Sequence, residues 1–342
     1  MTKIAINGFG RIGRLFFWQM QGQKDAQIVA INDLGSIANL AYLLQYDTVY
    51  GKFAEKVEAG EDCLLVAGKK VQVLQEKDPS KLPWRKLGVD IVVEATGVFE
   101  SYEEAKTHLR AGAKRVVISA PAKDLDGADG KTVLMGVNEE EMASCKITSN
   151  GSCTTNSVAA VMQILHEALG VRKAFLNTTH GYTATQSLVD GPTKGKDMRR
   201  GRAAAQNIVP SSTGAAVSVT RAVKELMNKF DGISLRVPVV AGSIADVTFL
   251  AARKTTVKEV NDILTKAASL QRWKDVLAVT KDPVVSSDIV GQPYGAIVDL
   301  EMTRVVDGDL VKVLSWYDNE WGYVATLVKH VLAAAKSLSS NN

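Results

Sequence analysis

Cys153 stands in a short polar stretch, residues 149–156 (SNGSCTTN), that places one thiol among several hydroxyls. Apolar residues then recur at helical spacing from Val158 to Leu169, and Gly170 is a natural helix stop. Cys153 is therefore expected in or just before the first helical turn, where unpaired N–H groups and the helix dipole favour an anion. The stretch predicts a reactive thiolate beside a site for an oxyanion or a phosphate. A helix cap with a small buried cysteine is the alternative.

His180 differs in its surroundings from the other three histidines of the chain. His108, His166 and His330 lie in predicted helices, where a core or solvated histidine is the ordinary expectation. His180 follows a predicted strand at 171–179, beside Gly, Tyr and Thr. An imidazole there is placed to act as a general base. From the residues alone, a structural histidine explains this position equally well.

The N-terminal residues carry a glycine pattern that suits a dinucleotide. After a predicted strand, Gly8, Gly10 and Gly13 fit G-x-G-x-x-G and lead into a helix. These glycines allow a tight turn, close approach of a pyrophosphate, and packing of helix on strand. Asp33 ends the next strand, 27–33, where its carboxylate can accept from ribose hydroxyls and repel a 2′-phosphate. The pattern predicts NAD rather than NADP; a glycine turn that binds nothing is the alternative.

Strands and helices alternate before residue 150. We predict strands at 70–74, 90–95, 114–119, 132–137 and 145–148, and helices at 38–45 and 102–111. This alternation indicates an α/β domain, 1–150, with a Rossmann-type, doubly wound parallel sheet. Ligands of such sheets bind at the carboxyl ends of the strands, which here fall at Asn7, Asp33, Thr96 and Ser119.

Strands dominate the residues after 150, and their side chains alternate in polarity. We predict strands at 171–179, 232–240, 246–253, 296–303 and 309–316, and helices at 217–226, 257–268 and 323–338. This pattern indicates an α+β catalytic domain, 151–318, with a mostly antiparallel sheet. The apolar face of the last helix, in segment 319–342, suits a return to the first domain.

Two further segments are candidates for function. Residues 184–209 show no strand period and carry a basic cluster of Lys194, Lys196, Arg199, Arg200 and Arg202. A loop of this length is usually functional or lies at an interface. Residues 211–214 (SSTG) form a hydroxyl-rich turn before a helix, which suits an anion or a plain helix cap.

The composition excludes several classes of protein. A chain of 342 residues with a net charge of +4 is ordinary for two globular domains, and that charge is far from a nucleic-acid-binding composition. The basic loop also lacks the interleaved aromatics that single strands bind, so no nucleic acid is required. Three cysteines form neither a disulfide framework nor a metal spacing, so no metal site is predicted. We expect a cytoplasmic protein, because neither a signal peptide nor a membrane-spanning run is evident.

In this order, the motifs resemble the phosphorylating glyceraldehyde-3-phosphate dehydrogenase family over nearly the whole chain. The matching segments are 6–14, 31–33, 149–156, 180–186, 211–216, 236–238 and 316–323. The resemblance implies that NAD binds through Gly8, Gly10, Arg11, Ile12, Asp33, Thr96, Ser119 and Asn319. It further implies that Cys153 attacks the aldehyde, that His180 assists as base, and that inorganic phosphate cleaves the resulting thioester.

The resemblance also assigns two anion sites. The substrate phosphate is expected at Thr183, Arg200 and Arg236, and the attacking phosphate at Ser152, Thr154, Thr213 and Gly214. Loop 184–209 matches the S-shaped loop of the family, which lines a neighbour's cofactor site in a homotetramer. The chain departs from the family at Gly151 and Gly181, where alanine is usual, and at Ala241, where many members carry a more polar residue.

Two other functions fit the same residues. Erythrose-4-phosphate dehydrogenase uses the same cysteine and histidine, although segments 180–186 and 211–216 favour the triose enzyme. A dinucleotide-binding sensor or interaction protein that has lost turnover is the other, and the intact pair of Cys153 and His180 argues against it.

Overall fold

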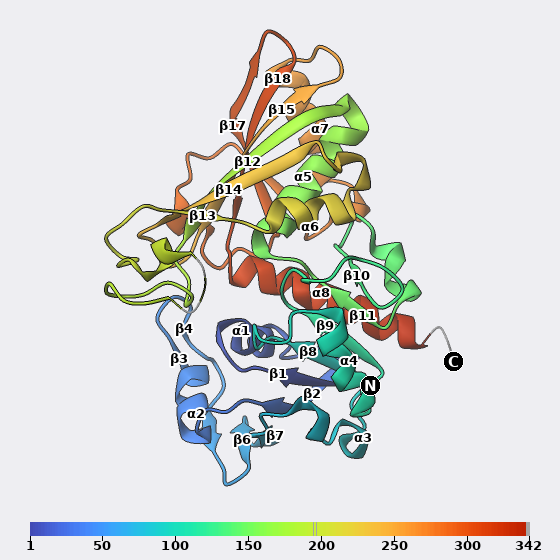
Figure 1. The fold of residues 1–342 in the computed structure, drawn as a ribbon, viewed down its shortest axis with the longest axis vertical. Coiled ribbons are helices and arrows are strands. Elements are labelled where there is room, and N and C mark those ends of the chain that lie inside the picture. The colour runs from blue at the N-terminus through green and yellow to red at the C-terminus, as the bar shows by residue number, and fades with distance from the viewer. Residues whose placement is uncertain (194, 196, 340–342) are drawn as a thin grey trace. The chain divides into compact units, whose positions relative to one another are not determined.

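The computed structural model describes residues 1–193, 195 and 197–339, which form two compact units (Figure 1). The first unit comprises Met1–Val133, Glu139–Gly151 and the C-terminal segment from Leu327, and the second comprises Leu134–Asn138 and Ser152–Thr326. The last helix thus begins in the second unit and ends in the first. The domain boundaries predicted from the sequence assign cofactor binding to residues 1–150 and catalysis to residues 151–318. They stay a prediction, because compactness alone does not test those functions. The last three residues of the predicted segment 319–342 lie outside the described residues.

A nine-stranded sheet forms the centre of the first unit. Its strands are β1 (Thr2–Asn7), β2 (Ala26–Asn32), β5 (Val57–Ala59), β6 (Cys63–Val66), β7 (Lys69–Leu74), β8 (Ile91–Glu94), β9 (Arg115–Ile118), β10 (Lys131–Thr132) and β11 (Ile147–Ser149). They follow the order β10-β11-β9-β8-β1-β2-β7-β6-β5. All pairs from β10 to β7 are parallel, and β6 and β5 continue antiparallel. The predicted Rossmann-type sheet is confirmed.

The other elements of the first unit connect these strands. They are α1 (Arg11–Gln19), α2 (Ile37–Gln45), α3 (Trp84–Leu87), α4 (Tyr102–Arg110), and the small pair β3 (Tyr46–Asp47) and β4 (Gly51–Lys52). Because β1 pairs with β2 on one side and β8 on the other, the strand order reverses at β1. Asn7 is in register with both Asn32 and Glu94, so three strand ends meet at the place where such sheets bind ligands.

The second unit contains a seven-stranded sheet. Its strands are β12 (Val171–Gly181), β13 (Val209–Ser212), β14 (Phe230–Val237), β15 (Ser243–Ala251), β16 (Leu277–Thr280), β17 (Ala296–Val306) and β18 (Leu310–Tyr317). They follow the order β13-β14-β12-β15-β18-β17-β16. Only β12–β14 and β16–β17 pair in parallel, so the predicted mostly antiparallel sheet is confirmed. The helices are α5 (Cys153–Leu169), α6 (Ala215–Ala222) and α7 (Val257–Ala268), and α8 (Trp321–Ser339) begins in this unit and continues into the first.

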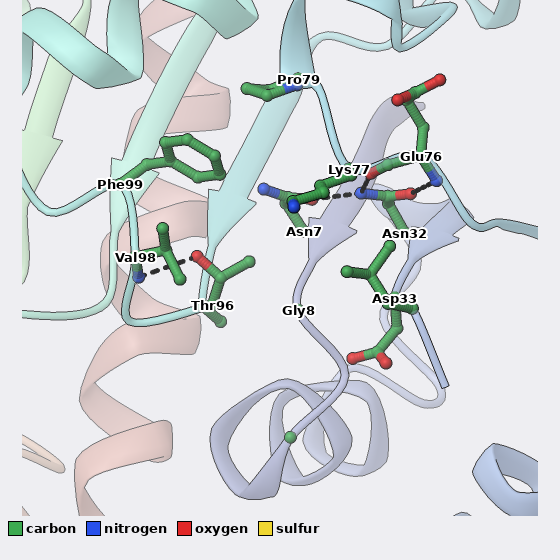
Figure 2. Close-up of a pocket in the computed structure, with 13 residues that line it drawn as sticks. Asn7, Gly8, Asn32, Asp33, Glu76, Lys77, Pro79, Thr96, Val98 and Phe99 are labelled. Carbon is green, nitrogen blue, oxygen red and sulfur yellow. Dashed lines mark hydrogen bonds between the residues drawn. The ribbon is translucent and has the colours of Figure 1, made fainter. Parts of the chain in front are cut away.

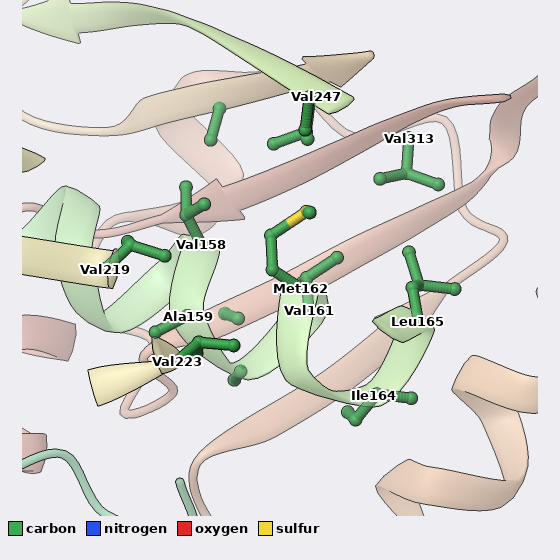
Figure 3. Packing of buried hydrophobic residues seen from close by; sticks show 14 of the residues in the cluster. Val158, Ala159, Val161, Met162, Ile164, Leu165, Val219, Val223, Val247 and Val313 are labelled. Atoms are coloured by element: carbon green, nitrogen blue, oxygen red, sulfur yellow. The ribbon is translucent and has the colours of Figure 1, made fainter. Parts of the chain in front are cut away.

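Helix α5 is held by the core of the second unit. Its Val158, Val161 and Met162 are fully buried and pack against Val247 of β15 and Val313 of β18 (Figure 3). Each such side chain contributes about 1.5–3 kcal/mol through burial. The first turn of α5, which begins at Cys153, is therefore carried on a well-anchored helix.

Three predicted elements differ from the structure. Of the predicted strand 132–137, only Thr132 lies in a strand, β10 (Lys131–Thr132). The chain turns after it, and the Leu134 N–H donates to Asn138 Oδ1 at 2.8 Å. Residues Ser211 and Ser212 are not a turn but the end of β13, paired with β14. The helix predicted at 217–226 starts earlier and ends at Ala222, followed by a short 3₁₀ turn.

Across the described ranges, none of the helices is both long enough and apolar enough to span a bilayer.

Candidate active site

Cys153 and His180 come together in the second unit. Ser152 caps α5, since its Oγ accepts from the Thr155 N–H at 3.1 Å, and this fixes the first turn that carries the thiol. His180 lies near the end of β12, and its Nε2 is 3.3 Å from Cys153 Sγ. The imidazole is buried, at 4% exposure, whereas Cys153 is half-buried. A thiol and an imidazole at this separation can exchange a proton directly.

The pKa of Cys153 is shifted in the direction opposite to the one that the helix dipole alone predicts. Burial raises the pKa of the Cys153 thiol, although the Arg236 guanidinium and nearby N–H groups act against that rise. Burial also lowers the pKa of His180 to about 3, and the positive charge of Arg236 adds to this effect. Desolvation therefore outweighs the helix dipole, and the described arrangement holds a neutral thiol beside a neutral imidazole.

Two groups compete for the other nitrogen of His180. Arg236 Nη1 lies 2.6 Å from Nδ1, and the Gly181 carbonyl oxygen also lies 2.6 Å from it. A guanidinium only donates and a carbonyl only accepts, so Nδ1 satisfies one of them at a time. Arg236, on β14 beside β12, is in register with His180. Its position against the ring follows from strand pairing.

A cluster of hydroxyls lies beside the pair. Tyr317 of β18 places its hydroxyl 2.7 Å from both Thr154 Oγ1 and Thr178 Oγ1, and its ring edge faces His180. The Thr154 side chain predicted to bind phosphate is thus buried and already hydrogen-bonded. Sequence reasoning did not name Tyr317 as a site residue, although it lies in the matching segment 316–323.

Asn319, predicted to bind the cofactor, lies in the second unit. Its Oδ1 accepts from the Ser243 hydroxyl at 2.9 Å, and Ser243 Oγ accepts from the Gly181 N–H at 3.1 Å. This chain of hydrogen bonds ties Asn319 to the residue that follows His180.

The residues predicted for the substrate phosphate surround the same strand end. Thr183 Oγ1 lies 2.9 Å from the Thr185 hydroxyl, to which Arg200 Nη1 donates at 3.1 Å. Arg200 is also close enough to lower the pKa of His180 through its charge, after burial and Arg236. Thr183, Arg200 and Arg236 thus lie around one region with positive potential, which suits an oxyanion.

The remaining predicted phosphate residues lie at the start of α6. Thr213 Oγ1 accepts from the Ala215 N–H at 3.1 Å, and Gly214 is the exposed N-cap residue. Helix α6 packs against α5 in the core of the second unit. Of the basic cluster in loop 184–209, Lys194 and Lys196 lie outside the described residues. Met198–Gly201 forms a 3₁₀ helix within that loop.

The first unit carries a cavity of about 420 Å³ at the strand ends around β1 (Figure 2). It is lined by residues that include Gly8, Gly10, Asp33, Thr96 and Phe99. Gly8 has φ +95°, and a Cβ there would lie 2.6 Å from the Thr96 nitrogen. A Cβ on Gly10 would meet nothing within 4 Å, which leaves its backbone open to a ligand. The cavity lies at the reversal point of the sheet, where sheets of this kind bind nucleotides.

Of the predicted cofactor residues, Gly8, Gly10, Asp33 and Thr96 line this cavity, whereas Arg11, Ile12 and Ser119 lie elsewhere in the first unit. Asp33 Oδ2 accepts from the Phe9 N–H at 2.7 Å, which ties the carboxylate to the glycine turn. Arg11 contacts Asp47, and Ile12 is half-buried in the first turn of α1. The Ser119 N–H donates to the Glu94 carbonyl at 2.9 Å, just beyond β9.

A buried polar network beneath the cavity was missed from the sequence. Glu94 is 2% exposed, and its Oε2 accepts from Asn7 Nδ2 at 2.6 Å and lies 3.0 Å from His108 Nε2. Trp84 Nε1 donates to His108 Nδ1 at 3.1 Å, so Nε2 carries the ring proton toward Glu94. The Thr96 N–H donates to Glu94 Oε1 at 2.8 Å. A lone acid within the apolar run 91–95 was the signal available.

Comparisons with known proteins agree across the chain. A family model described as "Glyceraldehyde 3-phosphate dehydrogenase, NAD binding domain" matches residues 2–102, and one for the C-terminal domain matches residues 152–319. The chain is 49% identical over 326 residues to the glyceraldehyde-3-phosphate dehydrogenase of Thermotoga maritima, covering 94% of this chain and 96% of that one. Identity is 46% to the Streptomyces coelicolor protein of that name (95% and 96% covered) and 44% to that of Clostridium pasteurianum (98% and 99%).

Proposed function

The chain belongs to the glyceraldehyde-3-phosphate dehydrogenase family and is an NAD-dependent oxidoreductase, and we propose that it oxidises glyceraldehyde 3-phosphate with NAD and inorganic phosphate to 1,3-bisphosphoglycerate. The observation that carries this proposal is the 3.3 Å separation of Cys153 Sγ and His180 Nε2 beside the Arg236 guanidinium and the Thr154 hydroxyl. That pair provides a nucleophile and a base where an aldehyde with a phosphate group can be held.

The cofactor site is proposed at the cavity of the first unit. Gly8 and Gly10 would hold the pyrophosphate, and Asp33 would accept from the adenosine ribose. Arg11, Ile12, Thr96 and Ser119 complete the proposed set in this unit, and the role of Asn319, which lies in the second unit, stays a prediction. When bound, NAD supplies the hydride acceptor of the reaction.

The side chains of the second unit supply the remaining chemistry. Cys153 Sγ adds to the aldehyde carbon, and the thiol proton is transferred to the new hydroxyl oxygen. His180 removes that hydroxyl proton as the adduct is oxidised, which leaves a thioester on Cys153. An oxygen of inorganic phosphate then attacks the thioester carbon, the sulfur leaves, and an acyl phosphate forms. A thioester retains enough transfer potential for this step, whereas a serine ester does not.

The proposed phosphate contacts follow from charge and hydroxyl placement. Thr183, Arg200 and Arg236 would hold the substrate phosphate, as their grouping around the end of β12 supports. Ser152, Thr154, Thr213 and Gly214 are proposed for the attacking phosphate. The Thr154 hydroxyl is held by Tyr317, so its contribution would come from its backbone N–H in the first turn of α5.

Initial rates test this function directly. NADH formation is measured with glyceraldehyde 3-phosphate and with erythrose 4-phosphate, with NAD or NADP, and with or without inorganic phosphate. We expect turnover that requires phosphate and NAD and a larger kcat/KM for the triose. A larger kcat/KM for erythrose 4-phosphate, or an unchanged rate in Cys153→Ser, contradicts the proposal.

We further propose a homotetramer that works in the cytoplasm. The second sheet exposes apolar side chains on neighbouring strands, including Phe175 of β12 at 53% exposure and Ile233 of β14 at 44%. Exposed apolar groups on adjacent strands favour association with another subunit. Light scattering coupled to gel filtration measures the mass, and a monomer contradicts this assembly.

A further inference from the structure

A second cavity of the first unit, of about 570 Å³, lies at the amino ends of β9 and β11. These two parallel neighbours begin here, at the edge of the sheet opposite to the strand ends around the nucleotide cavity. None of the residues proposed for NAD or for substrate lines it. Its walls include three apolar and three basic side chains, those of Leu109, Ala113, Leu338, Lys114, Arg115 and Lys146.

Arg115 is almost fully buried at this cavity, at 4% exposure. Its guanidinium donates to the carbonyl oxygens of Met142 and Cys145, the latter at 2.7 Å, and to the Ser337 hydroxyl at 2.7 Å. All three acceptors are neutral. Its Nε–H is buried and has no acceptor among the described residues. Folding therefore buries a full positive charge that these partners hydrogen-bond but do not neutralise, which is an unfavourable state.

The thiol of Cys145 does not supply the missing negative charge. It donates to the Ile147 carbonyl oxygen at 3.2 Å, and burial raises its pKa, although the nearby Arg115 acts against that rise. The thiol therefore stays protonated at neutral pH. Burial also lowers the pKa of Arg115, which is the effect expected of a cation without a countercharge.

The two lysines beside Arg115 differ in their partners. Lys114 Nζ lies 2.7 Å from Asp90 Oδ1, so its charge is already paired. Lys146 is exposed just before β11 and has no carboxylate partner in the part of the chain that the structure describes. The carbonyls at the end of the short 3₁₀ helix Glu139–Ser144 offset about half a charge at most. The cavity thus keeps more than one positive charge.

We propose that this cavity binds a phosphate monoester that carries an apolar group, with Lys146 and Arg115 supplying the positive charge and Leu109 and Leu338 the apolar contact. A phosphate monoester has a charge of about −1.5 to −2 at pH 7, which matches the charge left by Arg115 and Lys146. A bare phosphate would fill only a small part of 570 Å³, so the rest of the ligand has to suit apolar walls. This site is independent of the proposed function.

Hydrogen exchange locates the site in the full-length protein saturated with NAD. Phenyl phosphate is the ligand tested, and inorganic phosphate, benzoate and benzyl alcohol each lack one of its features. Mass spectrometry should show slower deuterium uptake with phenyl phosphate in peptides that cover residues 109–116, 139–147 and 332–338. Slower uptake confined to peptides of the second unit, where the substrate phosphate is proposed to bind, overturns the site.

The concentration dependence of this slowing gives the dissociation constant at the site. We expect phenyl phosphate to bind about tenfold more tightly than inorganic phosphate, which lacks the apolar group, and than benzoate, which has one charge. Benzyl alcohol should leave the exchange unchanged. Equal dissociation constants for phenyl phosphate and either anion contradict the proposed ligand class, as does an equal effect of benzyl alcohol.

Substitutions of an exposed lysine assign the charge. Lys146→Gln should weaken phenyl phosphate binding about tenfold through the loss of one charge-assisted hydrogen bond, and Lys146→Arg should restore it. Lys69→Gln is the matched control, because Lys69 is an exposed lysine that lines a different cavity of the first unit. All three variants should form NADH at the wild-type rate. An unchanged dissociation constant in Lys146→Gln overturns the proposal.

Discussion

The polar groups of the two sites differ in how far folding alone satisfies them. Beneath the cavity of the first unit, Glu94 has donors at both oxygens, from Asn7, Thr96 and His108. In the second unit, His180 Nδ1 meets a donor and an acceptor at the same distance. The first arrangement has one best state, and the second has two.

This difference fits what each site is proposed to do. A dinucleotide cradle benefits from backbone that is already in its final form, because less ordering is left to binding. A general base has to change its protonation during a cycle, so a ring with two available partners suits it. We therefore expect changes in the second site to affect rate more than stability, and changes in the first to affect stability.

His180→Asn tests the rate half of this comparison and should have the largest effect. Loss of the base is expected to lower kcat/KM for glyceraldehyde 3-phosphate by about 10²–10⁴-fold. The free energy of unfolding should change little, since the imidazole makes poorly matched hydrogen bonds. Steady-state rates and urea unfolding measure the two quantities.

His166→Asn is the matched control, because His166 is half-buried at the end of α5. It should retain the wild-type rate. If His180→Asn instead lost stability in proportion to activity, the second site would be as fixed as the first.

Gly8→Ala and Gly10→Ala test the first site with two similar changes. A Cβ at position 8 strikes the backbone of Thr96, and φ there is +95°, so we expect a loss of about 2–4 kcal/mol in unfolding free energy. A Cβ at position 10 has open space, so stability should change by less than about 0.5 kcal/mol.

For NAD binding, we expect the substitution at position 10 to have the larger effect. Its Cβ would stand where the pyrophosphate approaches, so Gly10→Ala should weaken NAD binding about tenfold or more. Calorimetric titration with NAD and urea unfolding of both variants check these outcomes. A Gly10→Ala protein with unchanged NAD affinity would place the cofactor elsewhere.

The sequence predicts these two sites to different depths. Periodicity and glycine spacing predict the parallel sheet, the strand that ends at Asp33 and the start of α5, because each is a local property of the chain. The meeting of Cys153 with His180 needs the family resemblance, since 27 residues separate them. The contact of Arg236 with His180 depends on strand register, which no local pattern reveals.

Glu94→Gln tests whether the first site has a single satisfied state. Both oxygens of Glu94 accept from donors, so an amide NH₂ in either orientation faces another donor. We expect a loss of about 2 kcal/mol in unfolding free energy and weaker NAD binding, because Thr96 and Asn7 lose their anchor. Glu58→Gln, at an exposed position, is the control and should match the wild type. A Glu94→Gln protein of wild-type stability would mean that the surrounding donors can rearrange to accept an amide in place of the carboxylate.

His330→Gln uses pH to compare a satisfied histidine with His180. His330 Nδ1 donates to Asn150 Oδ1 at 3.2 Å, and its Nε2 accepts from the Thr148 hydroxyl at 2.7 Å. Burial, with Arg115 nearby, lowers the pKa of His330 to about 3. The unfolded chain binds this proton below about pH 6.5, so folded stability is lost as pH falls from that value toward 3.

The variant should lose stability less steeply in that window. Unfolding free energies are measured at pH 7, 5.5 and 4.5. As the pH falls, the decrease should be smaller in His330→Gln than in the wild type by up to about 1.4 kcal/mol per pH unit, because the unfolded variant binds one proton fewer. His166→Gln controls for the substitution itself. Because burial also lowers the pKa of His180 to about 3, His180→Asn should flatten the curve in the same way. Parallel curves for wild type and His330→Gln would mean that His330 takes up its proton within the fold, and the first unit would then be as adaptable as the second.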